Sequence, residues 1–213
     1  MTQEEFKKIL KDAESGDVEA QYNLGCCYEN GEGVLVDKEK AVYWYKKSAE
    51  KGDSKAQNNL GRCYYYGIGL AEDKEKAVYW CTKSAEQGDA KAQYNLGRCC
   101  YDHDEDGLAV CNEEVIYWFT KAAKNGYAEA QNALGSCYEF GEAVEKDNEK
   151  AIYWYTKSAE NEYAKAQWNL GRRYEVGDIV EKDIEKAIYW YTKSAENGYS
   201  IAEFYLKKRF NKK

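Results

Sequence analysis

The chain has 213 residues, of which 44% are hydrophobic and 32% charged, so it can bury a core and is not compositionally disordered. Its formal net charge of −7 argues against a protein that wraps nucleic acid through phosphate contacts. No apolar run is long enough for a membrane span, and the first residues lack the basic and apolar regions of a secretory signal. The single histidine, His103, removes most acid–base and zinc chemistry.

Residues 1–17 predict one amphipathic helix at the start of the chain. Its apolar face carries Phe6, Ile9, Leu10 and Ala13. This pattern resembles the second helix of the units that follow, but without a partner helix. Because the open end of a helical array needs a covering helix, we expect residues 1–17 to be an N-terminal cap.

From residue 18 onward the sequence is periodic. The pattern Ala-Gln-x-x-Leu-Gly begins at residue 20 and recurs at offsets of 36, 36, 38 and 36, and a tryptophan follows each copy at the same offsets. A period in this range is typical of a solenoid built from stacked repeats. The predicted repeats are five consecutive units at 18–53, 54–89, 90–127, 128–163 and 164–199.

Each unit divides into two predicted helices. In the first repeat, the first helix has its apolar residues at helical spacing, and Gly25 lets a neighbouring helix approach closely because it has no Cβ. Gly31 and Gly33 end this helix, and Asp37 caps the next one. We expect the second helix to end at Gly52 and to bury Ala41, Trp44, Tyr45, Ser48 and Ala49. Glu162 stands where the other repeats have this closing glycine.

Residues 200–213 restart the first-helix pattern with Ala202, Leu206 and Phe210. Lys207 stands where each repeat has glycine, so this segment is expected to be a C-terminal capping helix. No linker separates the repeats. The sequence therefore predicts an all-α fold, a single solenoid domain of about 12 helices.

The repeat pattern resembles the Sel-one-like repeat family, whose members are relatives of the tetratricopeptide repeats. The matching segments in the first repeat are AQYNLG at 20–25, Tyr28, Gly31-x-Gly33, Asp37, Lys40-Ala41, Trp44-Tyr45 and Ser48-Ala49-Glu50. The resemblance implies a right-handed α-α superhelix of antiparallel helix pairs that acts as an adaptor or scaffold for other proteins. Some bacterial members of this family are secreted virulence or immune-interacting proteins, and the resemblance by itself names no partner.

The eight cysteines do not follow the disulfide pattern that the resemblance implies for secreted members. That pattern joins the end of a second helix to the next first helix, and the corresponding positions here are Ala49 and Gln57. Four cysteines instead hold one equivalent position in successive repeats, about 10 Å or more apart, beyond the reach of a disulfide: Cys27, Cys63, Cys99 and Cys137. We expect reduced cysteines and a cytoplasmic chain.

By analogy with tetratricopeptide repeats, the first helices are expected to line the concave face of the solenoid. One stripe of each first helix would then face a partner protein. The candidate binding residues on this stripe are Tyr22, Lys55, Asn58, Arg62, Tyr65, Lys91, Tyr94, Arg98, Tyr101, Asn132, Trp168 and Arg172.

Repeats two and three place four cations and no acid on this stripe: Lys55, Arg62, Lys91 and Arg98. Guanidinium groups bind carboxylates well, so the stripe predicts an acidic or C-terminal peptide as the partner. The alternative is that these cations pair with acids on neighbouring helices, as exposed charges usually do.

The third repeat is two residues longer than the others, in the turn DHDEDGLAVCNE at 102–113. This turn fits a calcium-loop pattern, with Gly107 at the bend and the candidate ligands Asp102, Asp104, Asp106, the Leu108 carbonyl and Glu113. Against this, Ala109 stands where such loops carry a larger apolar residue, and no sister loop exists. Closely packed solenoid helices also differ from the splayed helices of an EF-hand, so a solvated acidic turn is the alternative.

No catalytic set is evident in the sequence. His103 has no oriented nucleophile, and the recurring glycine pairs follow helices rather than strands. We expect a protein that is not an enzyme and requires no cofactor, with a protein or peptide as its partner. The main hypothesis is a scaffold or adaptor that holds a peptide in its concave groove. The alternatives are an inhibitor or immunity-type protein that blocks a basic partner, and a calcium-modulated binding module.

Overall fold

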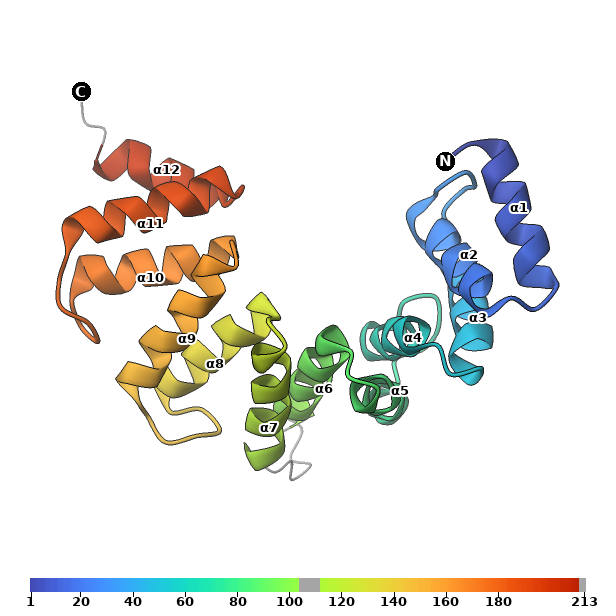
Figure 1. Cartoon of the computed structure of the whole chain (residues 1–213), viewed down its shortest axis with the longest axis horizontal. Coiled ribbons are helices and arrows are strands. Elements are labelled where there is room, and N and C mark those ends of the chain that lie inside the picture. The colour runs from blue at the N-terminus through green and yellow to red at the C-terminus, as the bar shows by residue number, and fades with distance from the viewer. Residues whose placement is uncertain (104–111, 211–213) are drawn as a thin grey trace. The chain divides into compact units, whose positions relative to one another are not determined.

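The computed structural model describes residues 1–103 and 112–210. For residues 102, 103 and 112 it describes the backbone alone. In these ranges the chain forms twelve helices and no strand (Figure 1), which confirms the predicted all-α class. The helices are α1 (Gln3–Glu14), α2 (Val18–Asn30), α3 (Lys38–Glu50), α4 (Ser54–Tyr66), α5 (Lys74–Glu86), α6 (Ala90–His103), α7 (Asn112–Lys124), α8 (Ala128–Phe140), α9 (Asn148–Glu160), α10 (Ala164–Val176), α11 (Ile184–Glu196) and α12 (Ser200–Arg209).

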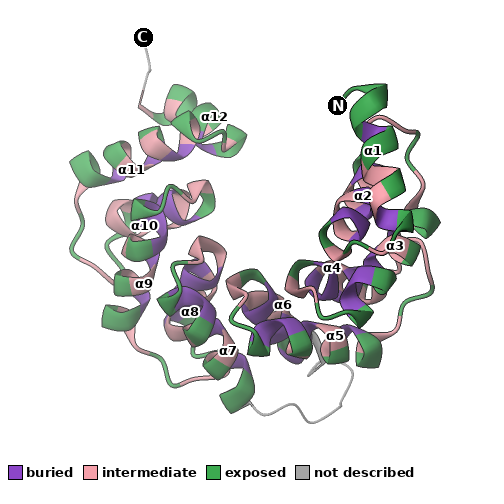
Figure 2. Cartoon of the chain, turned by 45° about the vertical axis from the view of Figure 1, so that its right-hand side comes forward, coloured by how far each residue is buried: buried purple, intermediate pink, exposed green. Residues whose placement is uncertain are grey.

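The chain divides into two compact units, Met1–Val110 and Cys111–Lys213, which we describe separately. Unit one contains α1 to α6, and unit two contains α7 to α12. Within each unit every helix packs against the next one along the chain, and in unit one α4 also contacts α6. In Figure 2 the buried residues of each unit lie along the helix faces that turn toward neighbouring helices. None of the described helices has the length and apolar character that a membrane crossing requires.

The helix ends form where the sequence predicts them. Asp37 caps α3, because its carboxylate accepts a hydrogen bond of 2.9 Å from the backbone amide of Lys40. Gly31 ends α2 in the left-handed conformation, with φ of 77°, which glycine adopts without steric cost. The replacement of glycine by Glu162 leaves this residue at φ 60°. The local signals therefore set the boundaries of the helix pairs.

In repeats one, two, four and five, the glycine of the first helix lies directly under a side chain of the second helix. A Cβ placed on Gly25 would lie 2.5 Å from Tyr45, and one on Gly171 would lie 2.7 Å from Tyr191. Both tyrosines are fully buried. Since carbon atoms cannot approach so closely, only glycine allows the two helices of a repeat to pack at this distance.

Trp44 is less buried than the sequence analysis expects. Tyr45 fills the interior beside Ala41 and Ala49, whereas Trp44 is half-buried at the edge of the cluster that includes Phe6. Trp44 also stacks edge-on against the exposed ring of Tyr43, with 5.1 Å between the ring centroids. Of the two adjacent aromatic residues, Tyr45 and not Trp44 therefore occupies the core.

The glutamine of each Ala-Gln-x-x-Leu-Gly motif joins its repeat to the preceding repeat or, for Gln21, to the N-terminal helix α1. Its side-chain amide donates a hydrogen bond of 3.0–3.1 Å to the carbonyl eight residues earlier, at the end of the preceding helix. Each of these carbonyls also accepts a hydrogen bond of 3.0–3.1 Å from the backbone amide three residues later, so the buried glutamine supplies its second donor. The five links are Gln21 to Ala13, Gln57 to Ala49, Gln93 to Ala85, Gln131 to Ala123 and Gln167 to Ala159.

The glycine contact predicts that Gly135→Ala destabilises unit two. The added methyl group would lie 2.6–2.9 Å from three ring carbons of the buried Tyr155. We expect a loss of about 1–3 kcal/mol from overpacking, which exceeds the gain of about 1 kcal/mol in helix propensity. Urea denaturation measures the loss, with the exposed Lys165→Ala as a control on α10. An unchanged or raised unfolding midpoint for Gly135→Ala would contradict the close-contact explanation.

Candidate functional site

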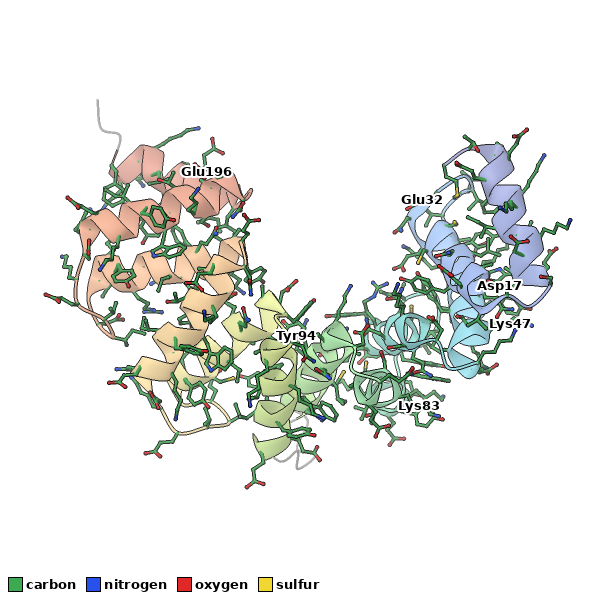
Figure 3. The ribbon with its side chains drawn as sticks, viewed as in Figure 1. Asp17, Glu32, Lys47, Lys83, Tyr94 and Glu196 are labelled. Carbon is green, nitrogen blue, oxygen red and sulfur yellow. The ribbon has the colours of Figure 1, made fainter. Side chains whose placement is uncertain are left out.

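In unit one, the predicted stripe forms a face on α2, α4 and α6. We call it the first-helix face and define it by Tyr22, Lys55, Arg62, Tyr65, Lys91, Tyr94, Arg98 and Tyr101. Lys55, Lys91 and Tyr101 are exposed, and the other five residues are partly buried. Figure 3 shows Tyr94 of α6 and Lys83 of α5 on different sides of unit one, so the first and second helices present separate surfaces.

Two residues predicted to face a partner are buried. Asn58 is 3% exposed and accepts a hydrogen bond of 2.7 Å from Asn95 of the next repeat. In unit two, Asn132 is 9% exposed and accepts a bond of 3.0 Å from Asn169 in the same way. Because these amides already bond across a repeat boundary, the structure assigns them to packing between repeats rather than to a binding surface.

Tyr22 lies partly beneath the first-helix face. Its ring is 6.0 Å from that of Tyr45, and the ammonium of Lys55 lies 6.0 Å from the Tyr22 ring centroid. Burial, followed by the hydrogen bond with Cys26, raises the pKa of Tyr22, so its hydroxyl stays protonated. The Tyr22 ring therefore makes a cation–π contact with the exposed Lys55.

A carboxylate in the first repeat connects three helices. Glu29 of α2 accepts a hydrogen bond of 2.6 Å from the Tyr45 hydroxyl of α3 and forms an ion pair with Arg62 of α4. Burial alone would raise the pKa of Glu29, but the hydrogen bonds from Arg62 and Tyr45 and the charge of Arg62 together lower it. We call this arrangement the tyrosine–carboxylate–arginine cluster.

Unit two contains the same kind of cluster twice. Glu139 accepts a 2.8 Å bond from the Tyr155 hydroxyl and pairs with Arg173 at 2.6 Å. Glu175 accepts bonds from the hydroxyls of Tyr191 and Tyr205 at 2.8–3.0 Å and pairs with Arg209 at 3.3 Å.

In unit two, the arginine that pairs with the carboxylate is not the predicted Arg172. Arg173 stands at the position of the repeated cysteines and reaches Glu139, whereas the predicted Arg172 is exposed on the adjacent side of α10. Trp168, also predicted to face a partner, packs against the rings of Tyr191 and Tyr205, with centroids 4.9 and 5.3 Å away. Trp168 therefore contributes to the packing between α10, α11 and α12.

The boundary between repeats two and three lacks the cluster. Cys81 occupies the position of the buried tyrosine, and Tyr65 occupies that of the carboxylate, while Arg98 repeats the position of Arg62. A small cavity of about 20 Å³ lies at this boundary. It is lined by Arg62, Tyr65, Tyr66, Cys81, Asn95, Arg98 and Cys99.

The structure leaves the calcium prediction untested. Most of the loop 102–113 lies outside the described residues, which include Glu113 as an exposed residue in the first turn of α7. The part of the chain that is described has no group of three or more His, Cys, Asp or Glu side chains placed to hold a metal ion.

The lowered pKa of Glu29 predicts a defined pH dependence of stability. A carboxyl group whose pKa is lower in the folded chain contributes stability above its ordinary value of 4.5, and this contribution is lost as pH falls through the folded value. We expect Glu29→Gln to lower the free energy of unfolding by about 1–3 kcal/mol at pH 7 and by less below pH 4.5. Urea denaturation at several pH values measures this, with the exposed Glu19→Gln on α2 as the control. A pH-independent difference would contradict the assignment.

The comparisons with known proteins agree with the repeat pattern. A family model for the Sel1 repeat matches residues 18–53, 54–89, 90–127, 128–163 and 164–199. A Sel1 repeat protein from Oxalobacter formigenes is 33% identical, with a TM-score of 0.84 over 90% of this chain and 76% of that one. A protective antigen with an SLR fold from uropathogenic Escherichia coli strains is 36% identical, with a TM-score of 0.80 over 94% of this chain and 43% of that one.

An immunity protein from Pseudomonas aeruginosa is 26% identical, with a TM-score of 0.61 over 92% of this chain and 72% of that one. No match is found among the curated proteins. Because the family model covers residues 18–199 in five consecutive copies, the chain belongs to the Sel1 repeat family, a fold of protein-interaction scaffolds.

Proposed function

We propose that this protein is an interaction scaffold that holds a segment of a partner protein against the first-helix face of repeats two and three. The observation that carries the proposal is the exposure of Lys55 and Lys91 on this face, in a protein of net charge −7. Cations concentrated on one face of an acidic protein favour a partner segment that carries carboxylates.

The ion pair between Arg62 and Glu29 shows which cations of the first-helix face can attract an acidic partner. Arg62 already pairs with Glu29, so its charge is largely neutralised within the chain. The cationic character of the face therefore depends on the exposed Lys55 and Lys91. Tyr94 and Tyr101 add aromatic surface on α6, and tyrosine rings provide contact area at low entropic cost.

A photo-crosslinking experiment tests which surface meets the partner. The crosslinking amino acid p-benzoylphenylalanine replaces either Tyr94 on the first-helix face or the exposed Tyr153 on a second helix. After irradiation in the native lysate, mass spectrometry identifies the protein attached at each position. We expect a specific partner at position 94. A partner attached at position 153 and not at 94 would contradict the proposed surface.

Charge reversal tests the acid preference. We expect Lys55→Glu combined with Lys91→Glu to reduce capture of the crosslinked partner at least about tenfold, since like charges across an interface cost several kcal/mol. Both lysines are exposed, so the folded chain tolerates the change. Lys46→Glu combined with Lys83→Glu alters the same charge on exposed positions of α3 and α5 and serves as the control. Undiminished capture by the first variant would show that the partner is not acidic.

An immunity-type inhibitor is the second candidate function. Its support is the 26% identity to the Pseudomonas aeruginosa immunity protein, together with the net charge of −7. An inhibitor of this kind would block a basic partner with its acidic surface rather than with the lysines of α4 and α6. The crosslinking experiment separates the two candidates, because a basic partner attached at position 153 favours inhibition.

Calcium binding by residues 102–113 stays a prediction of the sequence pattern, as does a cytoplasmic location. We expect calorimetric titration with calcium to give weak binding, because a solitary loop lacks the sister loop that strengthens paired sites. Asp104→Ala removes one of the predicted ligands and should abolish the heat. The absence of heat from the unmodified protein at millimolar calcium would contradict the prediction.

A further inference from the structure

A groove of about 570 Å³ lies in unit two, between α7 and the loop that joins α8 to α9. Ligand pockets commonly measure about 300–1,000 Å³, so the groove has room for several side chains of a peptide. None of its lining residues belongs to the first-helix face or to unit one. The helix contributes Ile116, Tyr117, Lys121 and Lys124 to this lining, and the loop contributes Ala143 and Val144.

The groove lies where another repeat has a close contact between loop and helix. In repeat two, a Cβ placed on Gly69 would lie 2.3 Å from the carbonyl oxygen of Lys38, at the start of α3. Ala143 stands at the equivalent position of repeat four and carries this methyl group, so its loop cannot approach the start of α7 as closely. Ala143 also adopts a φ of 59°, which is strained for a residue other than glycine.

The cations of the groove result from a charge reversal in the third repeat. In the other four repeats the second helix ends with a glutamate, at positions 50, 86, 160 and 196. In repeat four this Glu160 pairs with Lys157 at 3.1 Å. Repeat three keeps the lysine, as Lys121, but carries Lys124 in place of the acid. Within the part of the chain that the structure describes, no carboxylate pairs with either of these two lysines.

Both lysines are exposed in the last turn of α7. The ammonium of Lys121 lies 4.7 Å from the ring centroid of Tyr117, which itself lines the groove. Among the described residues of the lining, Glu113 alone is acidic. It begins the helix eight residues before Lys121, about 12 Å away along the axis, and salt screens exposed charges beyond about 8 Å. The lysine end of the groove is therefore cationic.

The groove is apolar beside the lysines. Ile116 and Val144 are half-buried, and Tyr117 is 51% exposed, so apolar surface stays in contact with water. Covering this surface with an apolar side chain is favourable. Ile116 precedes Lys121 by five residues, which is about 8 Å along a helix, and an extended peptide spans this distance with two to three residues.

We propose that this groove binds a segment of a partner protein in which a large apolar side chain and a carboxylate stand about three positions apart. The apolar side chain packs against Ile116 and Val144, and the carboxylate pairs with Lys121 and Lys124. Two adjacent cations select an acidic segment by charge complementarity, and the apolar surface supplies contact area. The groove gives the scaffold a second binding site, which does not depend on the first-helix face.

Short synthetic peptides test the chemistry of the ligand. The probes are acetyl-Gly-Leu-Gly-Gly-Glu-Gly-amide and its reversed order acetyl-Gly-Glu-Gly-Gly-Leu-Gly-amide, which cover both chain directions. Each has two counterparts, one with Gln in place of Glu and one with Ala in place of Leu. We expect at least one probe to bind the full chain tenfold or more tightly than both of its counterparts, as measured by calorimetry at pH 7. No binding, or equal affinities within both sets, would overturn the proposal.

Variants of the chain locate the bound peptide. Lys124→Glu introduces the residue that the other four repeats carry, so this variant should fold, and we expect it to weaken binding at least tenfold. Lys165→Glu makes the same charge change at an exposed position of α10 and should leave binding unchanged. Ile116→Ala should also weaken binding, whereas Ile188→Ala, at the equivalent position of α11, should not. Full binding by both Lys124→Glu and Ile116→Ala would overturn the proposal, and urea denaturation verifies that each variant is folded.

Two further measurements distinguish a partner segment from other occupants of the groove. Decanoate has an apolar chain and a carboxylate but no peptide group, and we expect it to bind more weakly than the better peptide probe. Tighter binding of decanoate would overturn the proposal in favour of a site for amphiphilic molecules. Sedimentation equilibrium of the full chain tests for a second copy in the groove. We expect no self-association that depends on Lys124, and self-association that Lys124→Glu abolishes would overturn the proposal.

Discussion

The packing of repeats one, four and five depends on one tyrosine that lies over one glycine. The glycine allows the two helices to approach until the ring fills the space between them, and the buried ring directs its hydroxyl at a carboxylate of the first helix. That carboxylate then pairs with an arginine of the next helix pair or cap. The tyrosine–carboxylate contact within a repeat is thereby connected to the carboxylate–arginine ion pair with the next repeat. In repeat proteins, such interfaces between neighbouring repeats contribute much of the stability.

The second and third repeats both depart from this scheme at two positions, with Cys81 and Tyr65 in the second and Phe119 and Tyr101 in the third. A tyrosine without its carboxylate would leave a buried hydroxyl unpaired, and a carboxylate without the tyrosine would lose a hydrogen bond. The joint exchange to Cys81 and Tyr65 avoids both costs.

The local features could be predicted from the sequence, but the contacts between repeats could not. The period, the capping Asp37 and the close approach at Gly25 follow from short-range rules, and the structure bears them out. The burial of Asn58 could not be predicted, because a stripe on one helix does not show which side chains the next repeat covers. The same limit explains why Arg173, rather than Arg172, pairs with Glu139. The paired exchange at Cys81 and Tyr65 was visible in the aligned repeats, but its meaning required the position of Gly61 beneath Cys81.

A double-mutant cycle measures most directly whether the tyrosine and the carboxylate act as one element. The cycle combines Cys81→Tyr with Tyr65→Glu, which rebuilds at repeat two the arrangement of repeat one. The account predicts that the double variant is more stable than the sum of the single changes by about 0.5–3 kcal/mol in urea denaturation. Strictly additive effects, or a double variant less stable than that sum, would contradict it.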